Sequence, residues 1–177
     1  MNRNVILDKV FREEKRKIIY AIKKAGCPDQ DMEDVFHQTL LTALENFDQL
    51  SDPSKAAAWC ISIAVNITRR KTERDKKVYI IDFYKEEHHP DLPEEAVYDV
   101  TQDEIENADL RMDMKRLLEK ISPEFAIPLQ LKVIYGFTYE EIAVIMGVKA
   151  GTVRSRINRA KRLLEKAIKN ERKTSEG

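Results

Sequence analysis

The residues between Ala150 and Lys173 carry side chains suited to binding phosphates and the edges of bases. This stretch holds nine basic residues and two acidic ones. Folded as a helix, it presents polar and basic side chains opposite a narrow apolar stripe; the polar set is Arg154, Ser155, Arg156, Asn158, Arg159 and Arg162. Arginine can donate two parallel hydrogen bonds to guanine O6 and N7 in the major groove. The spacing therefore indicates a helix that reads DNA.

The residues before this stretch predict the elements that would position it. Thr138 and Glu141 have the spacing of a capping box, and Phe137 and Ile142 occupy the two positions of a hydrophobic staple. Gly147 follows where a left-handed residue would end the helix. Together these signals predict a helix-turn-helix whose second helix enters the major groove. The plainer alternative is a helical hairpin with a solvated basic face.

Composition limits the fold class. The chain has 177 residues, of which 42% are apolar and 35% charged, with only 5 Gly and 6 Pro. Few turn-forming residues argue against an all-β fold, so we expect an all-α protein. No segment approaches the roughly 20 consecutive apolar residues that span a bilayer, and no apolar run of signal-peptide length is present at the N-terminus. We therefore expect a cytoplasmic protein without membrane insertion.

Charge divides the chain into three parts. Residues 1–78 hold 15 basic and 12 acidic residues, residues 79–110 hold 1 and 11, and residues 111–177 hold 15 and 8. The acidic part also contains two prolines and few large apolar residues, which is typical of a linker. We predict two small helical domains, 1–78 and 109–177, joined by an acidic linker at 79–108.

The N-terminal part shows three helical patterns. Apolar spacing predicts a first helix from Leu7 to Ile22, a second from Met32 to Phe47 and a third from Ala56 to Ile67. We expect Asp29 and Asp31 to satisfy the free amides at the start of the second helix. The outer face of the second predicted helix carries Asp34, Gln38, Leu41 and Glu45. This set indicates either a solvated face or a docking surface. The outer face of the third carries Ser62, Asn66, Arg69 and Arg70, a set that suits phosphates and base edges.

Catalytic and metal-binding patterns are weak. Cys27 and Cys60 have neither the number nor the spacing of a disulfide framework or a zinc site, so we expect both to be reduced and structural. His88 and His89 are adjacent, without the i, i+4 spacing that metal hydrolases use on helices. We therefore predict no catalytic residues, no metal and no cofactor, and we do not expect an enzyme.

The segment "GFTYEEIAVIMGVKAGTVRSRINRAKRLLEKA" resembles the promoter-reading C-terminal domain of the extracytoplasmic-function sigma factors of bacterial RNA polymerase. The segments "EDVFHQTLLTALENFDQL" and "AAAWCISIAVNITRRK" are similar to the other conserved domain of that family, and the acidic stretch falls where the family has a variable linker. The chain departs from the family pattern at His37 and Gln38, where Gln-Glu is usual, and at Leu50, where an aromatic residue is common.

The resemblance implies a role for each of three surfaces. The minus-35 element would be read by Arg154, Ser155, Arg156 and Arg159, with Lys161 on phosphate. The minus-10 element would be melted and read by Leu50, Ser51, Asp52, Asn66 and Arg70. The clamp helices of the largest polymerase subunit would be contacted by Asp34, Gln38 and Leu41.

The resemblance also implies the partners of the chain. These are core RNA polymerase, including its flap region, promoter DNA and an anti-sigma factor. The alternative from another class of protein is a stand-alone helix-turn-helix regulator, which would require a dimer interface.

Overall fold

A computed structural model describes residues 3–72, 116, 118 and 120–175. The predicted linker at 79–108, with His88 and His89, lies outside these residues. The described residues form seven α-helices and three short 3-10 turns, with no strand among them. The expected all-α fold is confirmed.

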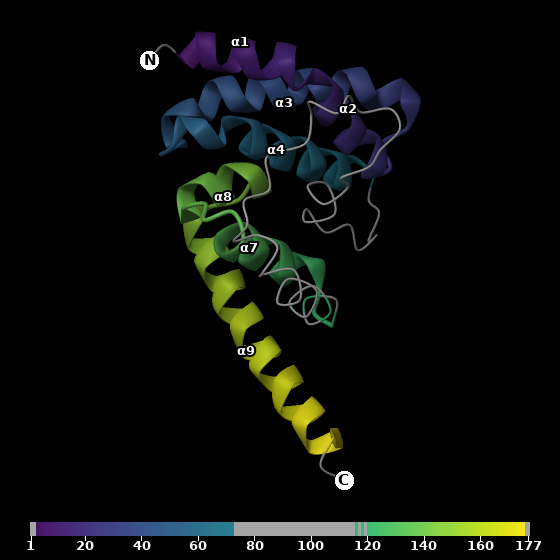
Figure 1. Ribbon diagram of the computed structural model, residues 1–177, viewed down its shortest axis with the longest axis vertical. Coiled ribbons are helices and arrows are strands. Elements are labelled where there is room, and N and C mark those ends of the chain that lie inside the picture. The colour runs from purple at the N-terminus through teal and green to yellow at the C-terminus, as the bar shows by residue number, and fades with distance from the viewer. Residues whose placement is uncertain (1–2, 73–115, 117, 119, 176–177) are drawn as a thin grey trace, which may run out of the picture.

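The N-terminal bundle, residues 3–72, contains four helices: α1 (Arg3–Glu13), α2 (Lys15–Lys24), α3 (Met32–Asn46) and α4 (Ala56–Lys71) (Figure 1). The prediction of a single first helix was wrong, because the chain breaks at Glu14, whose φ of −97° and ψ of 9° leave the α region. Backbone hydrogen bonds from Glu14 to Val10 and from Ile18 to Glu14 continue across the break. The apolar periodicity therefore continues across it as well.

The connections between these helices contain 3-10 turns at Asp29–Asp31, Phe47–Gln49 and Pro53–Lys55. Asp31 is the N-cap residue of α3, but its side chain does not make the expected hydrogen bond to the free amides of this helix. Its carboxylate instead lies 3.3 Å from the ammonium of Lys71 at the end of α4. A long-range ion pair has replaced the local cap.

Helix α4 is the centre of the molecule. Its residues 59–68 are buried without interruption, including Ser62, Asn66 and Thr68. Helices α2 and α3 pack on one side of α4 and α8 on the other, as Figure 1 shows. The predicted outer face of this helix is therefore covered at Ser62 and Asn66, because a second layer of helices lies against it.

The C-terminal unit, residues 118–175, contains α7 (Pro123–Val133), α8 (Tyr139–Met146) and α9 (Ala150–Ser175). Both halves of the predicted capping box are present: the Glu141 amide donates to Thr138 Oγ1 at 3.1 Å, and the Thr138 amide donates to Glu141 Oε2 at 2.6 Å. Gly147 ends α8 in the left-handed conformation, with φ of 63°. The helix-turn-helix is confirmed as a local structure.

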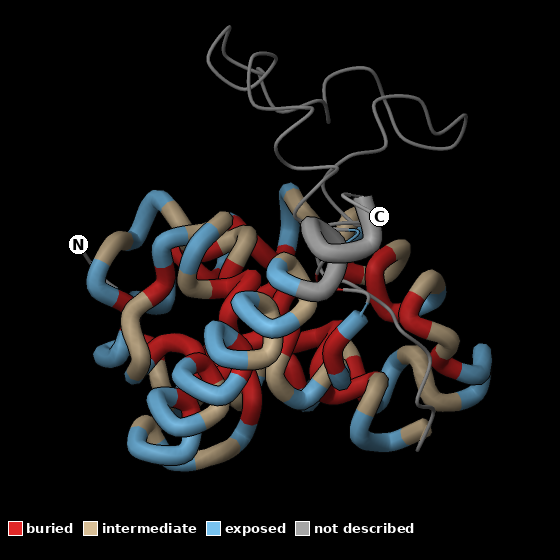
Figure 2. Tube along the Cα trace, turned by 90° about the horizontal axis from the view of Figure 1, so that it is seen from below, coloured by how far each residue is buried: buried red, intermediate tan, exposed pale blue. Residues whose placement is uncertain are grey.

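The apolar cores of the two parts join. Trp59 and Ile63 of α4 and Ile142 and Ile145 of α8 belong to one cluster of buried side chains. Figure 2 shows this buried interior in red, running beneath exposed outer surfaces. Within the described residues, the N-terminal bundle and the C-terminal unit thus pack as one body.

Two glycines in the helix-turn-helix test the backbone geometry of the turn. Gly147→Ala should destabilise the protein by about 1 to 2 kcal/mol, because a Cβ disfavours the left-handed conformation. The Arg70 guanidinium occupies the direction of that Cβ, but it ends a flexible side chain and can move.

Gly151→Ala is the matched control, since Gly151 lies in α9 with open space around its Cα. It should leave stability unchanged or raise it by about 0.4 to 1 kcal/mol. Urea unfolding of the two variants measures both effects. Equal stability changes would contradict the assigned turn.

Candidate nucleic-acid interface

Helix α9 presents to solvent the side chains that the sequence analysis assigned to base reading. Arg154, Ser155, Arg159 and Lys161 are exposed, while Arg156 is half-buried. The buried side of the helix consists of Val153, Ile157 and Ala160, as its apolar stripe predicts. Packing on α7 and α8 thus leaves most of the basic face of α9 exposed.

Two of these arginines are oriented by neighbouring side chains. The Arg154 guanidinium lies over the ring of Tyr139, 5.0 Å from its centroid, and Lys132 lies 5.1 Å from the same ring. Arg156 pairs with Glu124 at the start of α7, at 2.8 Å. Cation–π contacts at exposed sites contribute about 0.5 to 1 kcal/mol. Tyr139, which the sequence analysis passed over, therefore restricts the direction of Arg154.

The outer face of α3 is exposed, as predicted. Asp34, Gln38 and Leu41 all point to solvent, and Leu41 keeps 52% of its surface exposed. A large apolar side chain with that exposure, flanked by polar groups, is compatible with a docking surface.

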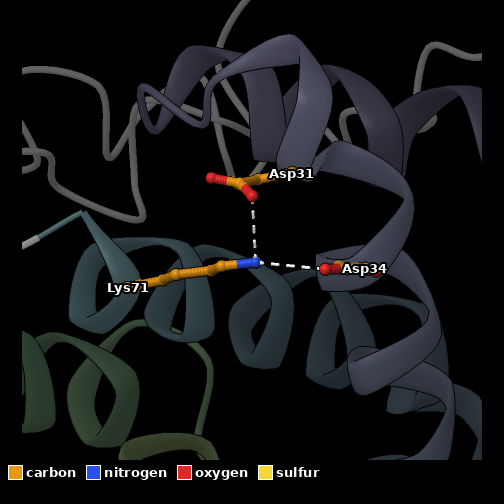
Figure 3. Close-up of polar contacts among 3 residues, drawn as sticks. All are labelled: Asp31, Asp34 and Lys71. Atoms are coloured by element: carbon orange, nitrogen blue, oxygen red, sulfur yellow. Dashed lines mark hydrogen bonds and ion pairs between the residues drawn. The ribbon is translucent and has the colours of Figure 1, made fainter.

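Lys71 connects this face of α3 to the end of α4. Its ammonium lies 3.3 Å from Asp31 and 3.4 Å from Asp34, between the two carboxylates (Figure 3). The hydrogen bond to Asp31 raises the pKa of Lys71, and the contact with Asp34 adds to it. Asp34 is thus held by a residue of α4 while its carboxylate remains accessible.

The loop assigned to the minus-10 element is ordered by hydrogen bonds. Asp52 Oδ1 accepts from the Ser54 amide at 2.9 Å and from the Ser54 hydroxyl at 2.7 Å, and these bonds lower the pKa of Asp52. Leu50 is buried, so its side chain supports the loop from within. Ser51 has an exposed surface, but its amide and hydroxyl both donate to Glu141 Oε1 at 2.8 Å.

The two α4 residues that the sequence analysis assigned to DNA differ in their exposure to solvent. Arg70 is exposed beside Gly147. Asn66 is only 3% exposed, and its Nδ2 donates to the carbonyl of Ile145 at 2.7 Å. The expectation that Asn66 faces outward is wrong for this conformation, because the last turn of α8 supplies its hydrogen-bond partner.

Two further residues of this region, Trp59 and Lys55, were not assigned a contact by the sequence analysis, and Glu141 was assigned only its capping role. Trp59 Nε1 donates to the Glu141 carbonyl at 3.4 Å, and Lys55 Nζ donates to the Tyr135 carbonyl at 3.2 Å. Burial raises the pKa of Glu141, but hydrogen bonds from Thr138 and Ser51 outweigh this effect and leave its pKa below the ordinary value. The capping-box spacing located Glu141, yet nothing in the sequence linked it to Ser51.

The cysteines match their predicted structural character. Cys27 and Cys60 are free and buried. Burial raises the pKa of Cys60 to about 12, which keeps the thiol un-ionised. Among the described residues, no group of three or more His, Cys, Asp and Glu residues is arranged to hold a metal ion. The same residues include no helix that is both long and apolar enough to cross a bilayer.

Comparison with known proteins gives one family match. Residues 111–164 match the family described as Sigma-70, region 4. This range contains α7, α8 and the first part of α9, and therefore the whole turn and the basic face described above.

Three curated relatives extend the similarity across the N-terminal bundle. "ECF RNA polymerase sigma factor SigE" of Mycolicibacterium smegmatis is 26% identical, with 89% of this chain and 59% of that protein covered. "RNA polymerase sigma-H factor" of Pseudomonas aeruginosa is 26% identical, with 91% and 85% covered. "ECF RNA polymerase sigma factor EcfG" of Rhodopseudomonas palustris is 29% identical, with 80% and 73% covered.

The first of these relatives is longer than the region of similarity, since the match spans 59% of its length. Because region 4 matches the C-terminal unit and relatives of one kind match 80% or more of the chain, the two lines of similarity agree. The C-terminal unit thus matches region 4 of sigma-70, and the chain as a whole is similar to extracytoplasmic-function sigma factors.

Proposed function

We propose that this protein is an alternative sigma factor, which binds core RNA polymerase and directs it to specific promoters. The observation that carries the proposal is the exposed basic face of α9 behind a complete helix-turn-helix, within the segment that matches region 4. The action is recognition and not catalysis. It takes place in the cytoplasm, where the polymerase and the chromosome are.

The two predicted domains bind different parts of the promoter, and one of them also binds the polymerase. The unit within 109–177 binds the minus-35 element through Arg154, Ser155, Arg156 and Arg159, and Lys161 contacts phosphate. The bundle within 1–78 binds the polymerase clamp through Asp34, Gln38 and Leu41, and reads the minus-10 element from the loop and α4. An anti-sigma factor that covers these surfaces is the further partner expected from the family.

Binding energy favours action through the polymerase. Each unit offers only a few phosphate contacts, and such modules bind DNA weakly at physiological salt. Held on one polymerase, both units bind the same promoter, and the second contact becomes intramolecular. The protein therefore needs the polymerase to select a promoter.

The test combines purified protein with bacterial core polymerase and genomic DNA fragments, followed by sequencing of the 5′ ends of the transcripts. We expect initiation at a defined set of sites that share two elements and require this protein. Tight binding of fragments without polymerase, combined with no initiation in its presence, would instead indicate a stand-alone regulator.

Arginine substitutions on α9 test the reading of bases. Arg154→Ala and Arg159→Ala should each weaken binding of the selected promoter by about 1 to 3 kcal/mol and relax base preference at one position. Lys161→Ala is the comparison, since loss of a phosphate contact should weaken all sequences alike and reduce the salt dependence. Competition binding of holoenzyme to single-base promoter variants measures the promoter affinity and the base preference of each variant. Unchanged base preference in both arginine variants would contradict this placement of α9.

Tyr139→Leu tests the orientation of Arg154. Loss of the ring should weaken promoter binding by about 0.5 to 1 kcal/mol, whereas Tyr139→Phe should bind as the wild type does, because it keeps the cation–π contact. In the Arg154→Ala background, Tyr139→Leu should have little further effect. Additive losses in the double variant would show that Tyr139 acts independently of Arg154.

The docking face on α3 is tested by Leu41→Ser. Removing a leucine that becomes buried on the clamp should weaken polymerase binding by about 1 to 2 kcal/mol. The matched control is Val5→Ser on α1, where a valine is 62% exposed outside the proposed face. Titration of labelled protein with core polymerase compares the two. Equal affinities of both variants and the wild type would exclude Leu41 from the contact.

A further inference from the structure

An ion pair between Arg156 and Glu124 joins α9 to α7. Arg156 lies on α9, one turn before Arg159 and on the same side of the helix. Glu124 is in the first turn of α7, directly after Pro123 at the start of that helix. Helices α7 and α9 pack on each other (Figure 1), and Arg156 Nη2 lies 2.8 Å from Glu124 Oε1. A carboxylate of α7 therefore reaches the basic face of α9.

The two partners of this pair differ in their exposure to solvent. The Arg156 side chain keeps 22% of its surface exposed, whereas Arg154 and Arg159 are exposed residues. The Glu124 side chain keeps 52% of its surface exposed, so water and ions reach the carboxylate. An ion pair with that accessibility adds little to the stability of a fold. We therefore expect its effect in the orientation and the charge of Arg156.

Contact with one carboxylate fixes the plane of a guanidinium without using all of its donors. Arginine carries five N–H donors in a rigid planar fork, and Glu124 lies against one nitrogen, Nη2. Recognition of guanine O6 and N7 requires two donors in a defined plane. An arginine side chain that is already held also loses less conformational freedom when it binds. Glu124 thus prepares Arg156 for contact with a base edge.

The same carboxylate changes the attraction of Arg156 to phosphate. Phosphate contacts carry no sequence information directly, and their strength depends on the positive charge that the protein brings to the backbone. Glu124 offsets the charge of Arg156 but leaves other guanidinium donors for hydrogen bonds. The pair therefore weakens binding to all sequences alike, while it keeps a contact that distinguishes bases.

We propose that Glu124 is a positioning residue that determines specificity: it directs Arg156 toward a base edge and restrains it from binding phosphate, which raises the ratio of promoter to non-promoter binding. The inference rests on the proposed function for the identity of the DNA that is selected. The orientation of Arg156 by Glu124 is measurable without that function.

The orientation is tested by NMR on the free full-length protein, through ¹⁵N relaxation of the arginine Nε–Hε groups. The spectrum of Arg156→Ala identifies the signal of Arg156. We expect this group to be restricted in the wild type and mobile in Glu124→Ala. Equal mobility of Arg156 in these two proteins would overturn the proposal.

Glu140→Ala is the matched control for Glu124→Ala. Glu140 is also an exposed acidic residue in the first turn of a helix of the same unit. Its removal changes the net charge by the same amount and leaves the ion pair of Arg156 in place. Arg156 should be as restricted in Glu140→Ala as in the wild type, and equal mobilisation in both variants would reduce the effect to net charge and refute the proposal.

Selectivity is tested by competition binding of holoenzyme to the selected promoter and its single-base variants. Glu124→Ala should lower discrimination about fivefold or more at the base that Arg156 reads. Binding of the free protein to a non-promoter duplex should become tighter, and its log–log salt dependence should steepen by about 0.9, because Arg156 then releases one more counterion. Glu140→Ala should change neither the discrimination nor the salt dependence.

Two further variants separate positioning from a purely structural role. Glu124→Gln removes the charge but keeps the size of the side chain, and it should also steepen the salt dependence. In the Arg156→Ala background, Glu124→Ala should have no further effect on base discrimination. Circular dichroism confirms that each variant is folded. A loss of thermal stability with unchanged discrimination and salt dependence would make the pair a structural link between α7 and α9 and refute the proposal.

The outcomes distinguish this inference from the proposed function. If the polymerase assay gives no initiation, discrimination is measured on the duplex that the free protein selects from a random pool. A loss of discrimination there in Glu124→Ala, together with a mobile Arg156, would uphold the role of Glu124 and reject the sigma-factor function. Initiation at defined promoters with unchanged discrimination in Glu124→Ala would uphold the function and reject this inference.

Discussion

Helix α4 is enclosed by protein on two sides, and this constraint organises the molecule. Its side chains 59–68 are all buried, so the helix requires packing partners on opposite faces. Helices α2 and α3 supply one face and α8 supplies the other. The position of the helix-turn-helix is therefore coupled to the burial of Trp59 and Asn66, and release of α8 would expose both to water.

The covered face of α4 and its adjoining loop carry hydrogen-bond donors whose chemistry is compatible with more than one kind of acceptor. Serine, asparagine and tryptophan offer N–H and O–H donors that bond equally well to backbone carbonyls, a carboxylate or the acceptors of a base. In the present conformation α8 supplies the acceptors, from Glu141 and Ile145. A buried face made only of apolar side chains would lack this property, since its exposure would favour aggregation over recognition.

Local signals and long-range contacts were predictable to different degrees. The capping box of Thr138 and Glu141 and the left-handed Gly147 act over four residues or fewer, so spacing predicted them correctly. The basic face of α9 and the exposed Leu41 followed from helical periodicity. Asn66 was misplaced because a polar residue opposite an apolar stripe normally faces solvent, and its true partner lies 79 residues away. The break at Glu14 escaped notice since the apolar spacing continues across it.

The most direct measurement compares the distance between the two units in the free protein and on polymerase. Spin labels at Glu45→Cys on α3 and Glu165→Cys on α9, both exposed positions, report it by electron–electron double resonance. The account predicts a single narrow distance distribution for the free protein, replaced by a longer distance when core polymerase and promoter DNA are added. A broad distribution in the free protein, or the same narrow distribution in the promoter complex, would contradict it.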